Sequence, residues 1–195
     1  LSSASGVHIV ATAGFYIEPC LPRFVGEWSV ARLADHLTRE IEEGVGGTTR
    51  RCGVLKSAIH RARPEGLELK GLKAVAIAQR RPGVAITSHT TGGRRQEVPG
   101  GTVGVAQLEI LKSEGVDPAR FIVGHVDERP DIDVLSTLAN EGCFIQFDVI
   151  GKQHWLLDAT RAELIAAMIG RGYVRHLLLS HDCNRDHEML YGGGG

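Results

Sequence analysis

Residues 122–126 of the chain read Ile-Val-Gly-His-Val, and residues 86–90 read Ile-Thr-Ser-His-Thr. In both stretches a short run rich in β-branched residues leads into a histidine, and such runs favour extended backbone. Two further runs lead into Lys56 and Asp182 in the same way. Four short apolar runs therefore end at a side chain that can ionise or bind a metal, and this pattern decides the fold class.

Short apolar runs alternate along the chain with amphipathic stretches, a pattern that indicates βα units and a parallel sheet. Strands are expected over 7–13, 52–57, 85–88, 121–124, 144–148 and 176–180. Capping residues, apolar spacing and closing glycines predict helices over 29–44, 105–115, 131–142 and 158–172, and apolar side chains are small or scattered in a fifth helix over 70–81. Asp158 is the expected N-cap of its helix.

This order of elements fits either a doubly wound sheet or a (β/α)8 barrel. A dinucleotide-binding sheet would carry G-x-G-x-x-G after its first strand, but the run 7–13 is followed by Gly-Phe-Tyr. In a barrel the carboxyl ends of all strands converge on one mouth, which would bring the four ionisable strand-end residues together. The sequence therefore predicts an α/β fold of the (β/α)8 TIM-barrel type.

The composition excludes several classes of protein. The chain has 195 residues, 22 Lys and Arg against 23 Asp and Glu, and a formal net charge of -1. It therefore lacks the excess of positive charge that would attract nucleic acid. Its apolar runs are also far shorter than the roughly 20 residues that span a membrane. Cys20, Cys52, Cys143 and Cys183 form no CxxC pair, which favours free thiols in a reducing cytoplasm over a disulfide framework or a zinc finger.

Lys56 presents an energetic problem, because an ammonium group on a buried strand costs several kcal/mol unless something compensates it. Three compensations are open. The amine could have a lowered pKa that suits Schiff-base chemistry, it could pair with a buried carboxylate, or it could react with CO2 to give an anionic carbamate that binds metal. The alternative is a lysine that extends from the strand end to solvent.

His89 and His125 occupy matching places in successive strands, and neutral imidazole is the commonest metal ligand in proteins. Two imidazoles from adjacent strand ends suit Zn, Mn, Co or Fe. The two-residue period of a strand places Asp182 on one side and His181 on the other. Asp182 is expected either to bind a metal and accept a proton from metal-bound water, or to cap a helix. The remaining histidines are assigned no metal, and His60 is expected to be solvated.

A series of short motifs then carries a resemblance to a known family. In order they are V-A-T-A-G-F-Y at 10–16, G-V-L-K at 53–56, T-S-H-T at 87–90, V-G-H-V-D at 123–127, I-Q-F-D-V-I-G-K at 145–152, L-L-L-S-H-D at 177–182 and Y-G-G-G-G at 191–195. The set resembles the phosphotriesterase family of the amidohydrolase superfamily, including the phosphotriesterase-related proteins and the phosphotriesterase-like lactonases. The resemblance covers nearly the whole chain.

The resemblance implies a (β/α)8 barrel with two divalent metal ions, Zn being expected and Mn, Co or Fe being alternatives. Lys56 would be carbamylated and bridge both ions, while His89 and His125 would hold the more exposed ion. Asp182 would bind the more buried ion and take up a proton, with a hydroxide bridging the pair. The partner is then a small-molecule substrate, and a homodimer is left open.

Two departures from the family pattern limit these expectations. No His-x-His pair precedes Val7, so we expect one domain over 1–195 that is truncated at both ends and covers about strands 3 to 8 of the barrel. Val149 stands where organophosphate-degrading members carry a histidine. The expected function is a metal-dependent hydrolase that cleaves an ester, lactone, amide or phosphotriester bond. The alternatives are a Schiff-base aldolase built on Lys56 and a catalytically inactive barrel fragment.

Overall fold

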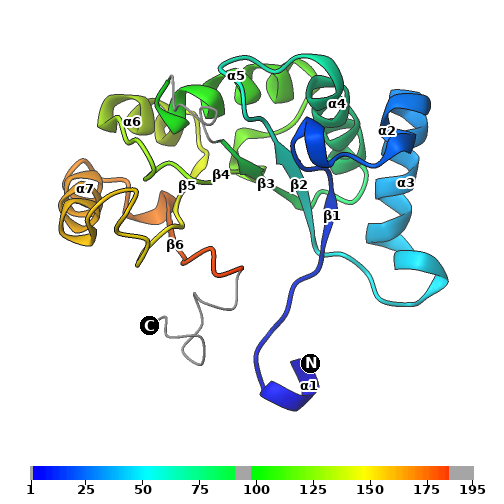
Figure 1. Cartoon of the computed structure of the whole chain (residues 1–195), viewed down its shortest axis with the longest axis horizontal. Helices are drawn as coiled ribbons and strands as arrows, with labels where there is room; N and C mark the ends of the chain where they lie inside the picture. Colours follow the sequence, from blue (N-terminus) through cyan, green and yellow to red (C-terminus); the bar gives the residue numbers. More distant parts are fainter. Residues whose placement is uncertain (1, 91–97, 185–195) are drawn as a thin grey trace.

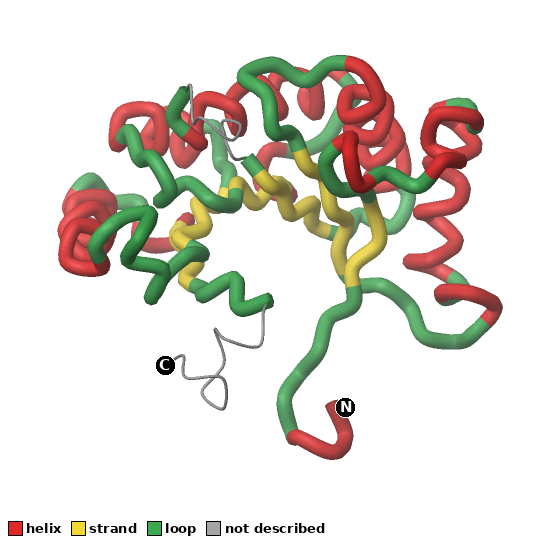
Figure 2. The backbone as a smooth tube through the Cα atoms, viewed as in Figure 1, coloured by secondary structure: helices red, strands yellow, loops and turns green. Residues whose placement is uncertain are grey.

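The computed structural model describes residues 2–90 and 98–184, so the motif at 191–195 lies outside the described residues. Six strands form one sheet: β1 (Thr12–Gly14), β2 (Val54–Ala58), β3 (Ala85–His89), β4 (Phe121–Val123), β5 (Phe144–Phe147) and β6 (Leu177–Leu179). Their order in the sheet is their order in the chain, and every pair is parallel (Figure 1). The strands curve into an inner layer with the helices outside it, as Figure 2 shows. The expected α/β architecture is confirmed.

Helices connect each strand to the next, and one short helix precedes β1. They are α1 (Ser2–Ser5), α2 (Arg23–Glu27), α3 (Val30–Glu42), α4 (Gly66–Arg80), α5 (Gly100–Ser113), α6 (Ile132–Asn140) and α7 (Asp158–Gly170), with short 3-10 turns at Glu18–Cys20, Val45–Gly47, Pro118–Arg120 and Val174–His176. Two of the expected caps are confirmed. The Ser29 hydroxyl accepts the N–H of Arg32 at the start of α3, and the Asp131 carboxylate accepts the N–H of Asp133 and of Val134 at the start of α6.

The two-residue period of the strands separates a helix-facing side from an inner side. In β2, Leu55 and Ser57 are buried under the helices while Lys56 is half-buried on the opposite side. In β3, Ile86 is fully buried and His89 is half-buried. The strands therefore contribute apolar side chains to the core beneath the helices and direct polar side chains toward the barrel interior.

Four expectations about the elements need correction. The strand expected over 7–13 begins only at Thr12, where pairing with Val54 of β2 starts, and residues 7–11 are exposed. The helices expected over 70–81 and 105–115 begin earlier, at Gly66 and Gly100. Asp158 does not cap its helix: it is the first residue of α7, and Leu157 is the N-cap. The reason is that its carboxylate accepts the N–H of Gly151 instead.

Among the residues that the structure describes, no helix is both long and apolar enough to cross a membrane. The longest of them, α4, has 15 residues. At 1.5 Å per residue such a helix is shorter than the roughly 30 Å hydrocarbon core of a bilayer.

The four cysteines differ in burial, and burial predicts how fast each thiol reacts. Cys20 and Cys183 are exposed, whereas Cys52 and Cys143 are buried. Burial, with the charge of Glu141 adding to it, raises the pKa of the Cys143 thiol to about 12, so this thiol stays protonated near neutral pH. We expect two fast-reacting thiols in native protein treated with Ellman's reagent at pH 8, and four after denaturation. Cys20→Ser should leave one fast thiol, and a third fast thiol in the native protein would contradict the packing.

Candidate metal centre

The four predicted ligands all lie toward the carboxyl edge of the parallel sheet. Lys56 is in β2 and His89 is the last residue of β3, and both belong to the inner side of the sheet. His125 and Asp182 follow the last residues of β4 and β6. Because all strands run in the same direction, these positions share one edge, which is the mouth of the barrel.

A glycine allows β1 to approach Lys56. Gly14 pairs in register with Lys56 and has a φ of +145°. A Cβ atom at position 14 would lie 2.1 Å from the Lys56 carbonyl oxygen, so a side chain there would push the two strands apart. The backbone at the first predicted ligand therefore depends on glycine in the neighbouring strand.

Opposing effects act on the pKa of the half-buried Lys56 amine. Burial lowers its pKa below the ordinary value, while the negative charges of Asp148 and Asp182 act in the opposite direction. Burial and the charges of two carboxylates therefore act on this amine together. Which of the expected compensations applies, or whether the amine extends to solvent, is left open by these contacts. Carbamylation of Lys56 stays a prediction.

The His89 and His125 rings lie edge to face, with their centroids 4.5 Å apart. Burial, with the charges of His125 and Lys56 adding to it, lowers the pKa of His89 to about 2. His89 is consequently neutral across the physiological range, which is the form that binds a metal. The hydroxyl of Tyr16 lies 3.5 Å from His89 Nε2, at the edge of the same cluster.

His125 is held by one buried carboxylate. Its backbone N–H donates to Asp148 Oδ1 at 2.9 Å, and its ring Nδ1 lies 2.8 Å from the same oxygen. A carboxylate accepts hydrogen bonds, so Nδ1 carries the proton and the Nε2 lone pair remains available for a metal. Burial alone would lower the pKa of His125, but its hydrogen bond to Asp148 and the charge of that residue raise it. His125 also has a φ of +55°, a left-handed conformation that these two bonds stabilise.

Asp148 is a site residue that the sequence reasoning missed. It is 5% exposed and its second oxygen accepts Gln146 Nε2 at 3.1 Å. The signal was present, because Asp148 follows the last residue of β5 just as His125 and Asp182 follow theirs. A search for metal-binding histidines alone passes over a carboxylate whose partner is one of those histidines.

Asp182 has a φ of +47° and a partner of its own. Lys152 Nζ donates to its carboxylate Oδ2 at 3.0 Å and to its carbonyl oxygen at 2.7 Å. The charge of Asp182 reaches Lys56, which places the two residues in one electrostatic environment. Cys183 and Asn184, which follow Asp182, are not helical, and the residues after them lie outside the described part of the chain, so the helix cap stays an alternative. Lys152, after β5, is the second residue that the sequence reasoning missed.

Two neighbouring acids have unusual environments. Glu128 is half-buried, and its pKa is raised to about 7. Burial is the largest cause, and the charges of Asp148 and other nearby carboxylates add to it. The charge of His125 acts in the opposite direction. Glu68, 4% exposed, lies 2.5 Å from Nδ1 of His60, so the expectation of a solvated His60 is wrong. A carboxylate this deeply buried requires such a partner, and His60 provides it.

The residues present fit a metal centre in part. The structure brings together two imidazoles and Lys56, and the Nδ1 of His125 is held in the manner of a metal-bound histidine. Within 2–90 and 98–184, no group of three or more His, Cys, Asp and Glu side chains has metal-binding geometry. The sequence-based prediction adds Lys56, as a carbamate, and Asp182, whose carboxylate is bound to Lys152 in the structure.

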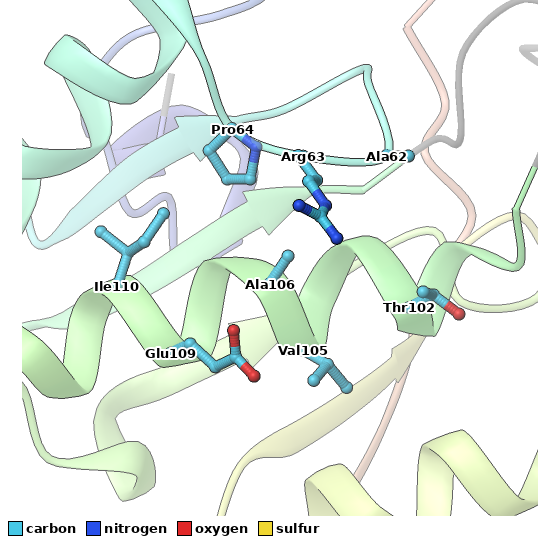
Figure 3. Close-up of a pocket in the computed structure, with 8 residues that line it drawn as sticks. All are labelled: Ala62, Arg63, Pro64, Thr102, Val105, Ala106, Glu109 and Ile110. Carbon is cyan, nitrogen blue, oxygen red and sulfur yellow. The ribbon is translucent and has the colours of Figure 1, made fainter.

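A surface pocket of about 480 Å³ lies away from these four residues, between the loop after β2 and helix α5 (Figure 3). Its lining residues are Ala62, Arg63, Pro64, Thr102, Val105, Ala106, Glu109 and Ile110. None of the predicted ligands lines it, so it is separate from the candidate metal centre.

The fold and the site together define part of a (β/α)8-type barrel with candidate metal ligands at the carboxyl ends of its strands. The chain belongs to the phosphotriesterase family, whose model matches residues 1–195. The family resemblance and the barrel fold predicted from the sequence are thereby confirmed.

Named relatives agree with this assignment. The phosphotriesterase homology protein of Escherichia coli is 31% identical over 191 residues, which cover 97% of this chain and 63% of the relative. Its crystal structure, with phosphate in the active site, matches with a TM-score of 0.91 over 99% of this chain and 64% of that one. An N-acetyltaurine hydrolase of Dictyostelium discoideum is 30% identical over 207 residues, covering all of this chain and 54% of the relative. A lactonase from Listeria monocytogenes matches at 26% identity and a TM-score of 0.86, covering 99% of this chain and 62% of that one.

Gly124 lies close to the Ser88 backbone and to the Asp148 carboxylate, so a substitution at Gly124 tests the packing of the candidate site. A Cβ atom at this position would lie 2.5 Å from the Ser88 carbonyl oxygen and 2.8 Å from Asp148 Oδ2. We expect Gly124→Ala to destabilise the fold by about 1–3 kcal/mol, because both neighbours must move. Thermal unfolding of the variant measures the change. Gly170→Ala is the control, since a Cβ there meets nothing within 4 Å. Equal melting temperatures for Gly124→Ala and the wild type would contradict the described approach of β4 to Asp148.

Proposed function

We propose that this chain is part of a metal-dependent hydrolase and that residues 1–195 belong to a single barrel domain, of which they cover about strands 3 to 8. The observation that carries the proposal is the arrangement around His125. A buried carboxylate holds its Nδ1 and leaves Nε2 available beside the neutral ring of His89. Lys56 lies in the same buried environment. Histidines prepared in this way at the mouth of a barrel are typical of metal centres.

The chain's own residues would divide the work as follows. Lys56, as a carbamate, would bridge two divalent ions, and His89 and His125 would hold the more exposed ion. Asp182 would accept a proton once Lys152 releases its carboxylate. When bound, two ions of Zn, or of Mn, Co or Fe, would supply an acidified bridging water as nucleophile and polarise the bond to be cleaved.

The substrate class follows from the site and from the relatives. We infer a small molecule with an ester, lactone, amide or phosphotriester bond, because the named relatives include a lactonase and an N-acetyltaurine hydrolase. Val149 stands beside Asp148 in place of the histidine expected of organophosphate-degrading members, which favours a carbonyl substrate over a phosphotriester. A screen of lactones, N-acyl amino acids and aryl phosphotriesters tests the preference for a carbonyl substrate, and hydrolysis of phosphotriesters alone would overturn that preference.

Removing either proposed histidine ligand should separate metal binding from folding. We expect His89→Ala or His125→Ala to lose about half of the bound metal and most of the hydrolytic activity, because each deletion leaves one of two ions short of a ligand. His181→Ala is the matched control, since its exposed ring bonds only to the Ile150 carbonyl among the contacts described. Metal content by mass spectrometry and activity on the substrate screen measure both effects. Equal losses in all three variants would show that these histidines are not ligands.

Lys56 distinguishes the proposed hydrolase from a Schiff-base aldolase. We expect Lys56→Ala to lower activity strongly, and short carboxylic acids to restore part of it by supplying the missing bridging oxygens. A carboxylate cannot form an imine, so an aldolase would show no such rescue. The measurement is activity against added acetate or propionate, with and without a chelator. Activity that survives the chelator, together with no rescue, would overturn the hydrolase in favour of the aldolase.

A further inference from the structure

Arg161 of α7 has the most buried guanidinium described in the chain, with 1% of the residue exposed. Its Nε donates to Asp127 Oδ2 at 2.8 Å, and its two terminal nitrogens reach the Leu156 carbonyl at 2.7 Å, the Lys152 carbonyl at 3.2 Å and Asp158 Oδ1 at 2.5 Å. A buried charge with this many partners holds those partners in fixed positions, because leaving any of them unpaired is costly.

Asp127, the main partner of Arg161, is fully buried. Besides the guanidinium, it accepts the backbone N–H of Asp148 at 3.3 Å and of Val149 at 3.4 Å. Burial and the nearby charge of Asp148 raise the pKa of Asp127, whereas Arg161 lowers it. Arg161 therefore offsets the repulsion between two buried carboxylates, and Asp127 fixes the backbone from which the second carboxylate extends.

Asp148 in turn holds His125 through both its backbone N–H and its ring Nδ1. A continuous series of hydrogen bonds thus runs from helix α7 to the mouth of the barrel, through Arg161, Asp127, Asp148 and His125. The same guanidinium binds the carbonyl of Lys152, whose ammonium contacts Asp182.

We propose that Arg161 is a positioning residue, which holds the His125 imidazole with Nε2 directed for metal binding by acting through Asp127 and Asp148. The orientation of the ring follows from the structure alone, and its consequence for metal affinity rests on the proposed function. Losing a partner of a metal-bound histidine typically weakens metal binding 10–100-fold. Arg161 differs from an ordinary structural arginine because its removal should alter a ring that it does not touch.

The test compares Arg161→Met with Arg171→Met. Arg171, the C-cap of α7, binds Asp133 and Ser136 on α6, and none of its described hydrogen bonds reaches the candidate metal centre. The first readout is the Nδ1 proton of His125 in metal-free protein, seen by NMR as a downfield signal protected from exchange. The second is the dissociation constant for Zn²⁺, measured by competition with a chromophoric chelator.

We expect Arg161→Met to lose the protected signal and to bind Zn²⁺ at least tenfold more weakly, whereas Arg171→Met should match the wild type in both. Arg161→Met leaves the Asp127 carboxylate buried without its partner, and the single variant could fail to fold for that reason. The double variant Arg161→Met with Asp127→Asn removes both charges, so it provides the same test in a protein without the unpaired charge. A protected Nδ1 signal that persists in either folded variant would overturn the positioning role. A wild type that shows the signal but binds no Zn²⁺ would overturn the proposed function while the role of Arg161 in orienting the ring would stand.

Discussion

The alternation of side chains along the parallel strands is the constraint on which the rest of the structure depends. Leu55 and Ile86 are buried beneath the helices, and the same pleat directs Lys56 to the interior of the barrel. A shift of one residue in β2 would bury the ammonium under the helices and expose Leu55. The register that forms the apolar core therefore also delivers the candidate ligands to the mouth.

Much of this arrangement could be predicted from the sequence because it follows from local patterns. Short apolar runs locate the strands, and His89 and His125 are visible as residues that end such runs. The Arg161–Asp127 pair was not predicted, because its partners are 34 residues apart and no local pattern relates them. Asp158 was misassigned as a cap because its carboxylate binds Gly151, which precedes it by seven residues and lies outside the pattern that defines a helix start. The strand at 7–13 was overextended because apolar residues favour a strand only where a neighbour pairs with them.

Backbone strain is concentrated at the candidate centre. Among non-glycine residues of the described chain, His125 and Asp182 have a positive φ, and both are predicted ligands. Such conformations persist only where surrounding bonds maintain them. Asp148 accepts the backbone N–H of His125, and Lys152 binds the carbonyl of Asp182. The polar groups that orient these side chains thus also stabilise the backbone conformations from which they extend.

The strands lie in the sheet in the order in which they occur in the chain, and this order affects how the molecule assembles. Each strand pairs with the one before it and the one after it, so a βα unit meets its neighbour as soon as that neighbour has been synthesised. The sheet can grow from its amino-terminal side while the ribosome is still translating. Among the predicted ligands of this chain, Lys56 is synthesised first, the two histidines follow, and Asp182 comes after β6. The apolar core around β1 to β5 can therefore form before Asp182 joins the candidate site.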